Sequence, residues 1–408
     1  MKLQRNYPIV TVTAKGEAAA RGGHPWVYGE EIINTVGEPE NGGMVDVVSA
    51  RGAYLGTGLF SAASKIRVRI LSRNGNDRFD DAFWKRRLRY AVDYRRTVMR
   101  RDFNACRLVF GESDGLPGLT VDRYSEILVA QFLSYGLDAR REMLMRALVD
   151  ILEKDGDVIR GVYERSDVAL RAKEGLEMRT GWIDIGRPLP DSTLVDIREN
   201  GILYTVDVEH GQKTGFFLDQ KYNRRAVARL TAGMRVLDCF THTGSFALNA
   251  AAGGAEHVTA VDISEAAVEL ARQNARRNGL EDRMDFVCAD VFELLTSLSE
   301  AHQHPYDMII LDPPAFTKSR KTVDSAQRGY YEINRRAMRL LPRGGYLATA
   351  SCSHFMDNAL FEKMLRRAAA DAQAELRQVE VRQQSPDHPT LWNVPETAYL
   401  KFYIFQIV

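Results

Sequence analysis

Cys352 is the residue whose type and position best suit covalent chemistry in this sequence. It stands between Ser351 and Ser353, directly after the apolar residues 344–350. Carbon 5 of a pyrimidine is a poor nucleophile, but a thiolate that adds to carbon 6 turns the ring into an enamine or enolate whose carbon 5 can attack a methyl-sulfonium. A cysteine is usually just a small buried apolar residue, whereas beside a cofactor pocket its thiolate could be stabilised. We therefore predict that Cys352 is a catalytic nucleophile.

Asp312 opens the segment Asp312-Pro313-Pro314-Ala315-Phe316, which follows the apolar residues 308–311. Two prolines after an acid at a strand end fix a rigid loop with few donors, which can hold the carboxyl group and backbone carbonyls against a planar base. Such a loop is typical of methyltransferases that act on amino groups or nucleobases. If protonated, or hydrogen-bonded to N3 and N4 of cytosine, Asp312 would stabilise the charge that thiolate addition creates. The sequence does not identify the base that removes the proton from carbon 5.

Three other acids end successive apolar runs, and together they predict a site for a nucleoside cofactor. Asp238 closes the first run, and Asp262, 24 residues later, closes the second, where it can accept hydrogen bonds from both ribose hydroxyls. Asp290 follows the third and can accept from the amino group of adenine. One acid at a strand end is more often a helix N-cap, but three in register favour an adenosyl group. The other predicted cofactor contacts adjoin these acids: Phe240, Thr243, Gly244, Ile263, Ser264 and Val291.

The identity of the cofactor follows from the turn after the first acid. Residues 236–246 predict a strand, a turn that contains Gly244 and the start of a helix, an arrangement that lets backbone groups approach a ligand closely. The turn has one glycine where the dinucleotide fingerprint has three, which disfavours a nicotinamide cofactor. Ile263 and Val291 are placed to hold an adenine ring between them. Together with the loop at Asp312, the pattern predicts S-adenosylmethionine as the cofactor.

The elements that must position these residues begin near residue 199, where apolar strands start to alternate with longer helical stretches. The predicted strands are residues 235–239, 257–262, 284–290, 306–312 and 344–352. This alternation predicts a doubly wound α/β sheet with its ligands at the carboxyl ends of the strands. A hairpin turn is predicted just before it, at Asn200-Gly201.

The preceding residues predict two other kinds of structure. The first 70 or so show short alternating apolar segments broken by glycine, which predict a small all-β module such as a compact barrel. Residues from about 76 to 195 alternate helical and strand-like stretches, beginning with an arginine-rich helix from about Asp80 to Arg101 and including a hairpin at Ser125-Glu126. We therefore expect three domains, residues 1–75, 76–195 and 196–408, with a linker at residues 186–190.

Basic residues are concentrated in one stretch, although the formal net charge is only +1. Residues 65–101 hold 13 Lys or Arg against 4 Asp. Such a run is usually a solvated helix face, but here aromatic residues interleave with the arginines, which suits phosphate contacts combined with base stacking. The stretch is therefore a predicted RNA contact. Its aromatic residues are Phe79, Phe83, Trp84, Tyr90 and Tyr94.

Composition and cysteine spacing indicate an ordinary globular protein, with 45% hydrophobic and 27% charged residues. No run of 18 apolar residues occurs, so we expect no membrane span and a cytoplasmic location. Cys106, Cys239, Cys288 and Cys352 lie far apart without a C-x-x-C pair, which predicts reduced thiols and no metal site. The sequence leaves open whether the chain forms a homodimer.

Over essentially its full length, the chain resembles the bacterial large-subunit (23S) ribosomal RNA cytosine-C5 methyltransferase I family. The resemblance implies an N-terminal PUA domain, a middle α/β domain and a Rossmann-like S-adenosylmethionine-dependent methyltransferase domain, with ribosomal RNA as the partner. It also implies that residues 212–220 help to bind the cofactor through Lys213, Thr214 and Asp219. His242 departs from the family pattern, where tyrosine is common, and Ala315 departs where some members have lysine. The matching signatures are residues 24–27 (HPWV), 112–123 (ESDGLPGLTVDR), 164–167 (ERSD), 210–220 (HGQKTGFFLDQ), 387–389 (DHP) and 395–396 (PE).

Two other functions remain open from the sequence. The first is a guanine N-methyltransferase, because relatives with the same sheet and an Asp-Pro-Pro loop act on guanine without a covalent intermediate and typically lack the cysteine of Ser-Cys-Ser. The second is a non-catalytic RNA-binding factor of ribosome assembly, against which the intact acids and Cys352 argue. Cytosine rather than uracil rests on the resemblance alone, because thiolate addition serves both bases.

Overall fold

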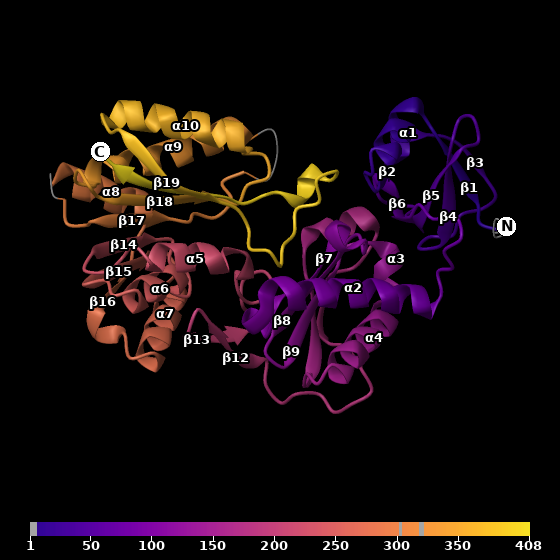
Figure 1. Cartoon of the computed structure of the whole chain (residues 1–408), viewed down its shortest axis with the longest axis horizontal. Coiled ribbons are helices and arrows are strands. Elements are labelled where there is room, and N and C mark those ends of the chain that lie inside the picture. The colour runs from indigo at the N-terminus through magenta and orange to yellow at the C-terminus, as the bar shows by residue number, and fades with distance from the viewer. Residues whose placement is uncertain (1–5, 302–303, 318–321) are drawn as a thin grey trace. The chain divides into compact units, whose positions relative to one another are not determined.

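The computed structural model describes residues 6–301, 304–317 and 322–408 of the chain. The chain divides into two compact units. The first contains residues 1–197, 205–218 and 386–397, and the second contains residues 198–204, 219–385 and 398–408. Figure 1 labels most of the helices and strands of both units. The chain therefore passes between the units more than once, and no single cut in the sequence separates them.

The N-terminal part of the first unit is a six-stranded sheet in the order β2-β6-β5-β4-β1-β3. Its apolar residues alternate as predicted, so that Val10, Val12 and Val47 are buried in one cluster. Gly58 cannot be replaced without moving the sheet, because a Cβ there would lie 2.2 Å from the carbonyl oxygen of Arg69 on the neighbouring strand. The strands are β1 (Ile9–Val12), β2 (Trp26–Tyr28), β3 (Ile32–Val36), β4 (Met44–Ser49), β5 (Tyr54–Phe60) and β6 (Ile66–Ser72).

A helix interrupts this module, which we expected to be all β. Helix α1 (Ala14–Arg21) follows β1 directly and contains four alanines, the residue with the highest helix propensity. Its N-cap is Thr13, whose Oγ1 accepts a hydrogen bond from the backbone N–H of Gly16 at 3.2 Å. The capping threonine and the alanines are signals that the alternating pattern around them concealed.

The rest of the first unit is built around a five-stranded sheet in the order β11-β10-β9-β8-β7. The predicted hairpin at Ser125-Glu126 is confirmed, because β8 and β9 pair in antiparallel register from Tyr124 opposite Ile127. The strands are β7 (Ala105–Phe110), β8 (Leu119–Tyr124), β9 (Ile127–Phe132), β10 (Gly161–Ser166) and β11 (Arg179–Trp182), and the helices are α2 (Asp81–Met99), α3 (Tyr135–Asp138) and α4 (Arg141–Lys154).

Helix α2 corrects part of the predicted RNA contact. Phe83 and Trp84 are buried in the core, so they offer no surface on which a base could stack. The arginines of the helix meet acids instead: Arg96 pairs with Asp155 at 3.1 Å and Asp157 at 2.5 Å. The sequence shows the charge run but not these partners, since they lie about 60 residues further along the chain. Phe83, Trp84 and the paired Arg96 are therefore part of the packing of the first unit, whereas Tyr90 and Tyr94 of the predicted contact are 62% and 37% exposed.

A two-stranded hairpin formed by β12 (Leu194–Glu199) and β13 (Ile202–Asp207) follows. Its predicted turn at Asn200-Gly201 is confirmed: both residues have positive φ, 52° and 89°, as a tight hairpin turn requires.

The second unit contains a seven-stranded sheet in the order β16-β15-β14-β17-β18-β20-β19. Its first five strands in this order are parallel, and β20 is antiparallel to both β18 and β19. The predicted doubly wound fold is confirmed, whereas β19 and β20 were missing from the predicted strands. The strands are β14 (Arg235–Cys239), β15 (His257–Asp262), β16 (Met284–Cys288), β17 (Met308–Leu311), β18 (Tyr346–Ser351), β19 (Leu376–Arg382) and β20 (Lys401–Ile407).

Helices cover both faces of this sheet, with α9 and α10 on one face and α6 and α7 on the other in Figure 1. The core between the sheet and α9 and α10 includes Leu237, Leu311, Tyr330 and Phe361, all fully buried. The helices are α5 (Lys221–Ala228), α6 (Ser245–Ala252), α7 (Glu265–Arg277), α8 (Val291–Glu300), α9 (Val323–Leu340) and α10 (Asn358–Ala372). Among the described residues, no helix has the length and apolar character needed to span a membrane.

Candidate active site

The predicted site residues of the second unit lie at one edge of its sheet, where the parallel strands end. The register places Asp238 of β14 beside Ala260 of β15 on one side and Ile310 of β17 on the other. Strand β17 ends one residue before Asp312, and β18 ends one residue before Cys352. Because carboxyl ends of parallel strands meet at the same edge, the fold brings the predicted acids and the predicted nucleophile together. The order of the strands reverses between β14 and β17, the place where such sheets bind ligands.

Asp238 is fully buried at the end of β14. Its Oδ2 accepts hydrogen bonds from Oγ1 of Thr241 at 2.6 Å and from the backbone N–H of Ala247 at 2.9 Å. Its Oδ1 has no hydrogen-bond partner among the described residues. Burial raises the pKa of Asp238 to about 7, against these two hydrogen bonds, which lower it. A buried carboxylate oxygen without a donor is costly, so this oxygen suits a ligand donor.

The turn after β14 has an unusual backbone. Phe240 and His242 have φ values of 65° and 50°, which residues with side chains rarely adopt. Gly244 also has positive φ, 79°, and a Cβ there would lie 3.0 Å from the Cβ of Ala271. Such conformations cluster at functional sites. Thr243 is buried, and its Oγ1 has no hydrogen-bond partner among the residues that the structure describes. The turn therefore fits a bound polar ligand.

Asp262 ends β15 and receives two backbone N–H groups. Its Oδ2 accepts from His242 at 2.9 Å and its Oδ1 from Ser264 at 3.0 Å, so its carboxylate is held in one orientation. Ser264 caps α7, with Oγ accepting from Ala267 at 3.3 Å. The side chain of Ile263 between them is 71% exposed, which leaves an apolar face for a planar group. These three residues lie together at the end of β15, where the sequence predicted ribose and adenine contacts.

The third acid and its neighbour serve the fold at least in part. Oδ1 of Asp290 accepts hydrogen bonds from Phe292 N at 2.7 Å and Glu293 N at 3.2 Å, as the N-cap of α8. This is the alternative that a single acid at a strand end favours. Val291 is buried in the core cluster, so Ile263 is the exposed member of the predicted apolar pair.

The residues that only the family resemblance implied are divided between the units. Lys213 and Thr214 belong to the first unit, where Thr214 is buried and its Oγ1 donates to Oδ2 of Asp122 at 2.5 Å. Asp219 belongs to the second unit and accepts a hydrogen bond from the hydroxyl of Tyr399 at 2.6 Å. The structure thus joins Asp219 to the unit of the predicted acids and anchors Thr214 elsewhere.

Cys352 is half-buried, and it differs in this from the other cysteines. Cys106 and Cys239 are buried, and burial raises the pKa of the Cys239 thiol well above its usual value. Cys288 is exposed at the end of β16. A half-buried thiol at a ligand-binding edge is the one of the four that a substrate could reach in a partly desolvated setting.

Three residues near the predicted pair were not foreseen. Gln220 donates from Nε2 to Oδ1 of Asp312 at 2.8 Å. Tyr330 of α9 interacts electrostatically with both Cys352 and Asp312, and burial raises its pKa to about 12. Lys401 lies next to the Ser-Cys-Ser segment across the sheet. No spacing in the sequence connects Tyr330 or Lys401 to Cys352, whereas Gln220 falls inside one of the family signatures.

Two family models match the chain. The model of the S-adenosylmethionine-dependent methyltransferases matches residues 168–406, which cover the seven-stranded sheet except its last residue, Ile407. A PUA-like domain model matches residues 10–73, which cover the six-stranded sheet. The chain is therefore an S-adenosylmethionine-dependent methyltransferase with a PUA-like domain, as the sequence predicted, and the unpaired buried oxygens of Asp238 and Thr243 fit such a cofactor.

Relatives over nearly the full length narrow the family. A protein from Aeromonas salmonicida named ribosomal RNA large subunit methyltransferase I is 42% identical over 380 residues, which are 93% of this chain and 94% of the relative. The chain belongs to the ribosomal RNA large subunit methyltransferase I family. A member of this family from Escherichia coli (strain SMS-3-5 / SECEC) is 39% identical over 400 residues, 97% of this chain and 99% of its own.

Solved structures agree in fold with this family member. A putative S-adenosylmethionine-dependent methyltransferase from Streptococcus mutans has a TM-score of 0.81 at 22% identity and covers 98% of this chain and 99% of its own. A putative methyltransferase complexed with SAH has a TM-score of 0.82, with the same identity and coverage. At this identity the likeness establishes the fold.

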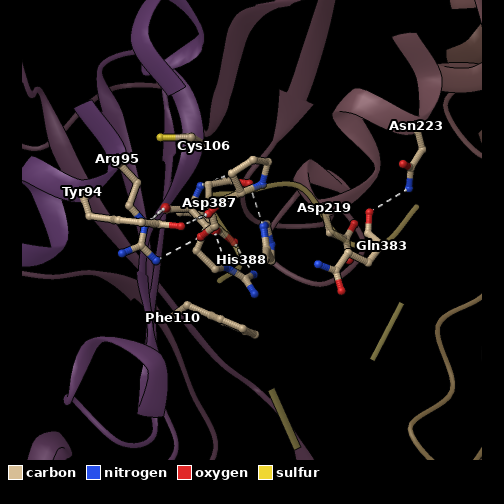
Figure 2. A network of polar contacts seen from close by, with 12 residues as sticks. Tyr94, Arg95, Cys106, Phe110, Asp219, Asn223, Gln383, Asp387 and His388 are labelled. Atoms are coloured by element: carbon tan, nitrogen blue, oxygen red, sulfur yellow. Dashed lines mark hydrogen bonds and ion pairs between the residues drawn. The ribbon is translucent and has the colours of Figure 1, made fainter. Parts of the chain in front are cut away.

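One signature that links the chain to the ribosomal RNA large subunit methyltransferase I family, Asp387-His388-Pro389, packs into the first unit (Figure 2). Asp387 accepts the backbone N–H of Arg107 through Oδ2 at 2.8 Å, and its carbonyl oxygen accepts from Nη2 of Arg95 at 3.0 Å. The ring of His388 lies 5.5 Å from that of Phe110. These contacts are buried, so this signature anchors the chain segment 386–397 in the first unit.

Proposed function

We propose that this chain transfers the methyl group of S-adenosylmethionine to carbon 5 of a cytosine in 23S ribosomal RNA, with Cys352 as the covalent nucleophile. The observation that carries the proposal is the half-buried thiol of Cys352 at the end of β18, next to the strand end that bears Asp312. The relatives named above support large-subunit ribosomal RNA as the substrate. Cytosine rather than uracil rests on the resemblance noted in the sequence.

The reaction balances around the thiol. The thiolate of Cys352 adds to carbon 6, forming a carbon–sulfur bond and making carbon 5 nucleophilic. The cofactor supplies the methyl group to carbon 5 and leaves as S-adenosylhomocysteine. A base then takes the proton from carbon 5, the electrons of that C–H bond restore the double bond, and the carbon–sulfur bond breaks to return the thiolate. Asp312, protonated or hydrogen-bonded to N3 and N4 of the ring, stabilises the charge that builds up during addition.

The predicted cofactor contacts take distinct parts in this proposal. Asp262 accepts from the ribose hydroxyls, and the exposed face of Ile263 packs against adenine. The unpaired Oδ1 of Asp238 and Oγ1 of Thr243 contact the methionine part, with backbone groups of Phe240, Gly244 and Ser264 around the ligand. Oδ2 of Asp290 accepts from the adenine amino group while Oδ1 caps α8. We keep Lys213, Thr214 and Asp219 as proposed contacts on the family resemblance alone, and Val291, which is buried, on its position next to Asp290.

The PUA-like module is the proposed RNA-binding part of the first unit. On α2, the exposed side chain of Lys85 remains for phosphate contacts, whereas the exposed Arg86 pairs with Asp77 at 3.4 Å. Contacts between basic side chains and RNA phosphates add affinity but do not distinguish one base from another. Recognition of one cytosine therefore falls to the site at the end of β17 and β18.

Replacing Cys352 by alanine tests the covalent mechanism. In the full-length Cys352→Ala protein we expect methylation of ribosomal RNA to be abolished, with the affinity for S-adenosylmethionine unchanged by calorimetry. Cys288→Ala is the matched control, because Cys288 is exposed at the end of β16, which three strands separate from β18, and the proposal gives it no role in the reaction. Bisulfite sequencing of ribosomal RNA from a deletion strain carrying each variant identifies the product as 5-methylcytosine.

The outcome also separates the alternatives. Full methylation by Cys352→Ala would exclude the covalent route and favour a guanine N-methyltransferase. A wild-type protein that fails to bind S-adenosylmethionine would instead favour a non-catalytic assembly factor.

A further inference from the structure

Lys401 is a buried lysine that the mechanism so far does not use. It begins β20, and the antiparallel register of β18 and β20 places it opposite Ser351, the residue before Cys352. Its Nζ donates hydrogen bonds to the carbonyl oxygen of Ser353 at 2.6 Å and to that of Tyr399 at 2.8 Å. The amine is therefore fixed to the backbone one residue beyond the thiol.

The charges around Lys401 make this position unusual. Burial lowers the pKa of Lys401 to about 8, and Cys352 and Asp357 act in the opposite direction. Asp357 is the N-cap of α10, where its Oδ1 accepts from Leu360 N at 2.8 Å. Among the described residues, Lys401 forms no salt bridge with a carboxylate, although buried charges are normally paired.

The thiol has its own neighbours on the other strands and helices. Tyr330 on α9 and Asp312 after β17 face the same space, and the raised pKa of Tyr330 keeps its phenol neutral at physiological pH. Asp312 is held by Gln220. The ammonium of Lys401 is a cation that interacts electrostatically with Cys352.

We propose that Lys401 is a positioning residue that holds Cys352 as a thiolate, with its ammonium as the counter-ion of the sulfur. This inference rests on the proposed role of Cys352 as nucleophile. A cation beside a cysteine increases its thiolate fraction at neutral pH. An ammonium has three N–H donors, of which two meet backbone carbonyls and one is left for the sulfur. The same charge stabilises the thiolate that leaves when the carbon–sulfur bond of the product adduct breaks.

The first test uses the wild-type protein alone. The rate of alkylation by iodoacetamide is measured for each cysteine by peptide mass spectrometry, from about pH 5.5 to about pH 9.5. We expect the midpoint for Cys352 to lie at least about one pH unit below that for the exposed Cys288, which serves as the internal reference. A midpoint for Cys352 equal to or above that of Cys288 would overturn the proposal.

Two variants then separate charge from packing. Lys401→Met removes the charge and keeps the aliphatic stem, whereas Lys401→Arg keeps the charge. We expect Lys401→Met to raise the alkylation midpoint of Cys352 by about one unit or more and to move the acid limb of the kcat profile by the same amount, while Lys401→Arg restores most of both. An unchanged midpoint in Lys401→Met refutes the counter-ion role.

The experiment distinguishes this inference from the mechanism on which it rests. Alkylation rates report the thiolate without any methyl transfer, so they decide the role of Lys401 even if Cys352→Ala methylates RNA at the full rate. If Lys401→Met does not fold, because it leaves the carbonyls of Ser353 and Tyr399 without their donor, the wild-type comparison and Lys401→Arg still decide the question.

Discussion

Gln220 holds Asp312 in place: Nε2 of the amide donates to Oδ1 of the carboxyl group at 2.8 Å, across 92 residues of sequence. Oδ1 of Asp312 faces the amide of Gln220, and this hydrogen bond thereby fixes the orientation of the whole carboxyl group. Oε1 of Gln220 accepts in turn from Nδ2 of Asn223 at 2.6 Å, so the amide cannot rotate freely. A carboxyl group positioned in this way is ready to meet a substrate base without reorganisation.

Gln220→Leu is therefore expected to lower kcat for RNA methylation by roughly 10- to 100-fold, because a misplaced catalytic group typically costs that much. The affinity for S-adenosylmethionine should fall less than kcat, since the proposed contacts of Asp238 and Asp262 lie at the ends of other strands and only Asp219 adjoins Gln220. Gln273→Leu, on the exposed face of α7, is a control of the same chemistry. Unchanged kcat in Gln220→Leu would show that the orientation of Asp312 does not limit the reaction.

If Asp238 contacts the cofactor as proposed, we expect cofactor binding to depend on pH. Its pKa of about 7 means that roughly half of the carboxyl groups carry a proton at neutral pH. A cationic ligand group at the unpaired Oδ1 favours the carboxylate, so binding should release about half a proton per site at pH 7 and almost none at pH 9. Calorimetry in buffers of different ionisation enthalpy measures this number. Proton uptake at pH 7 would contradict it.

The same residue sets a stability trend in the absence of cofactor. The folded pKa of Asp238 is raised above the ordinary value of 3.8, so protonation favours folding; this contribution is complete below about pH 4 and is lost as pH rises through about 7. It amounts to about 4 kcal/mol. Asp238→Asn keeps an acceptor for Thr241 and Ala247 and carries no charge. Its Tm should exceed that of wild type by clearly more at about pH 8.5 than at about pH 5, with the difference vanishing only below about pH 4. If Asp238→Asn and wild type had equal Tm values at both pH values, Asp238 would not carry a destabilising buried charge at high pH.

Asp290 allows its two roles to be separated. Asp290→Ala removes both the N-cap of α8 and the proposed acceptor for adenine, and should cost about 1 kcal/mol of unfolding free energy. Asp290→Ser retains a capping oxygen, so its stability should stay near that of wild type while its affinity for S-adenosylmethionine falls about tenfold. Chemical denaturation and calorimetry report the two quantities. Wild-type affinity in Asp290→Ser would leave Asp290 as a cap only.

The arginines of α2 provide a test of where RNA binds. Arg96 is paired with Asp155 and Asp157, so Arg96→Ala should reduce stability by up to about 1 kcal/mol and leave the salt dependence of RNA binding unchanged. Lys85→Ala, at an exposed and unlinked position of the same helix, should lower the slope of log K against log salt by about 1. If Arg96→Ala lowered this slope and Lys85→Ala did not, the arginines of α2 would be the RNA contact.

The placement of the candidate site residues at one edge of the second unit's sheet could be predicted, because these residues follow strand ends. Asp238, Asp262 and Asp312 each follow an apolar run, and parallel strands bring such residues to one edge whatever the loops between them do. The hairpins at Ser125 and Asn200 could also be predicted, because each turn depends on neighbouring residues that tolerate positive φ.

The features that could not be predicted depend on contacts between residues far apart in the sequence. Strands β19 and β20 lie at the antiparallel end of the sheet, and without them Lys401 has no visible relation to Cys352. The aromatic residues of α2 gave a misleading pattern, because burial of Phe83 and Trp84 depends on a sheet that forms later in the chain. The division of Lys213 and Asp219 between the units is likewise a property of tertiary contacts.

The route of the chain between the two units has a consequence for biosynthesis. The first unit includes residues 386–397, and Asp387 in that segment supplies buried partners to Arg95 and Arg107 of the N-terminal half. Those arginines emerge from the ribosome about 280 residues before their partner. At the usual rate of about 5–20 residues per second they wait on the order of 14–60 s. The enzyme therefore completes its N-terminal unit only after the methyltransferase sheet has been almost entirely synthesised, and a nascent chain must be kept from aggregating until then.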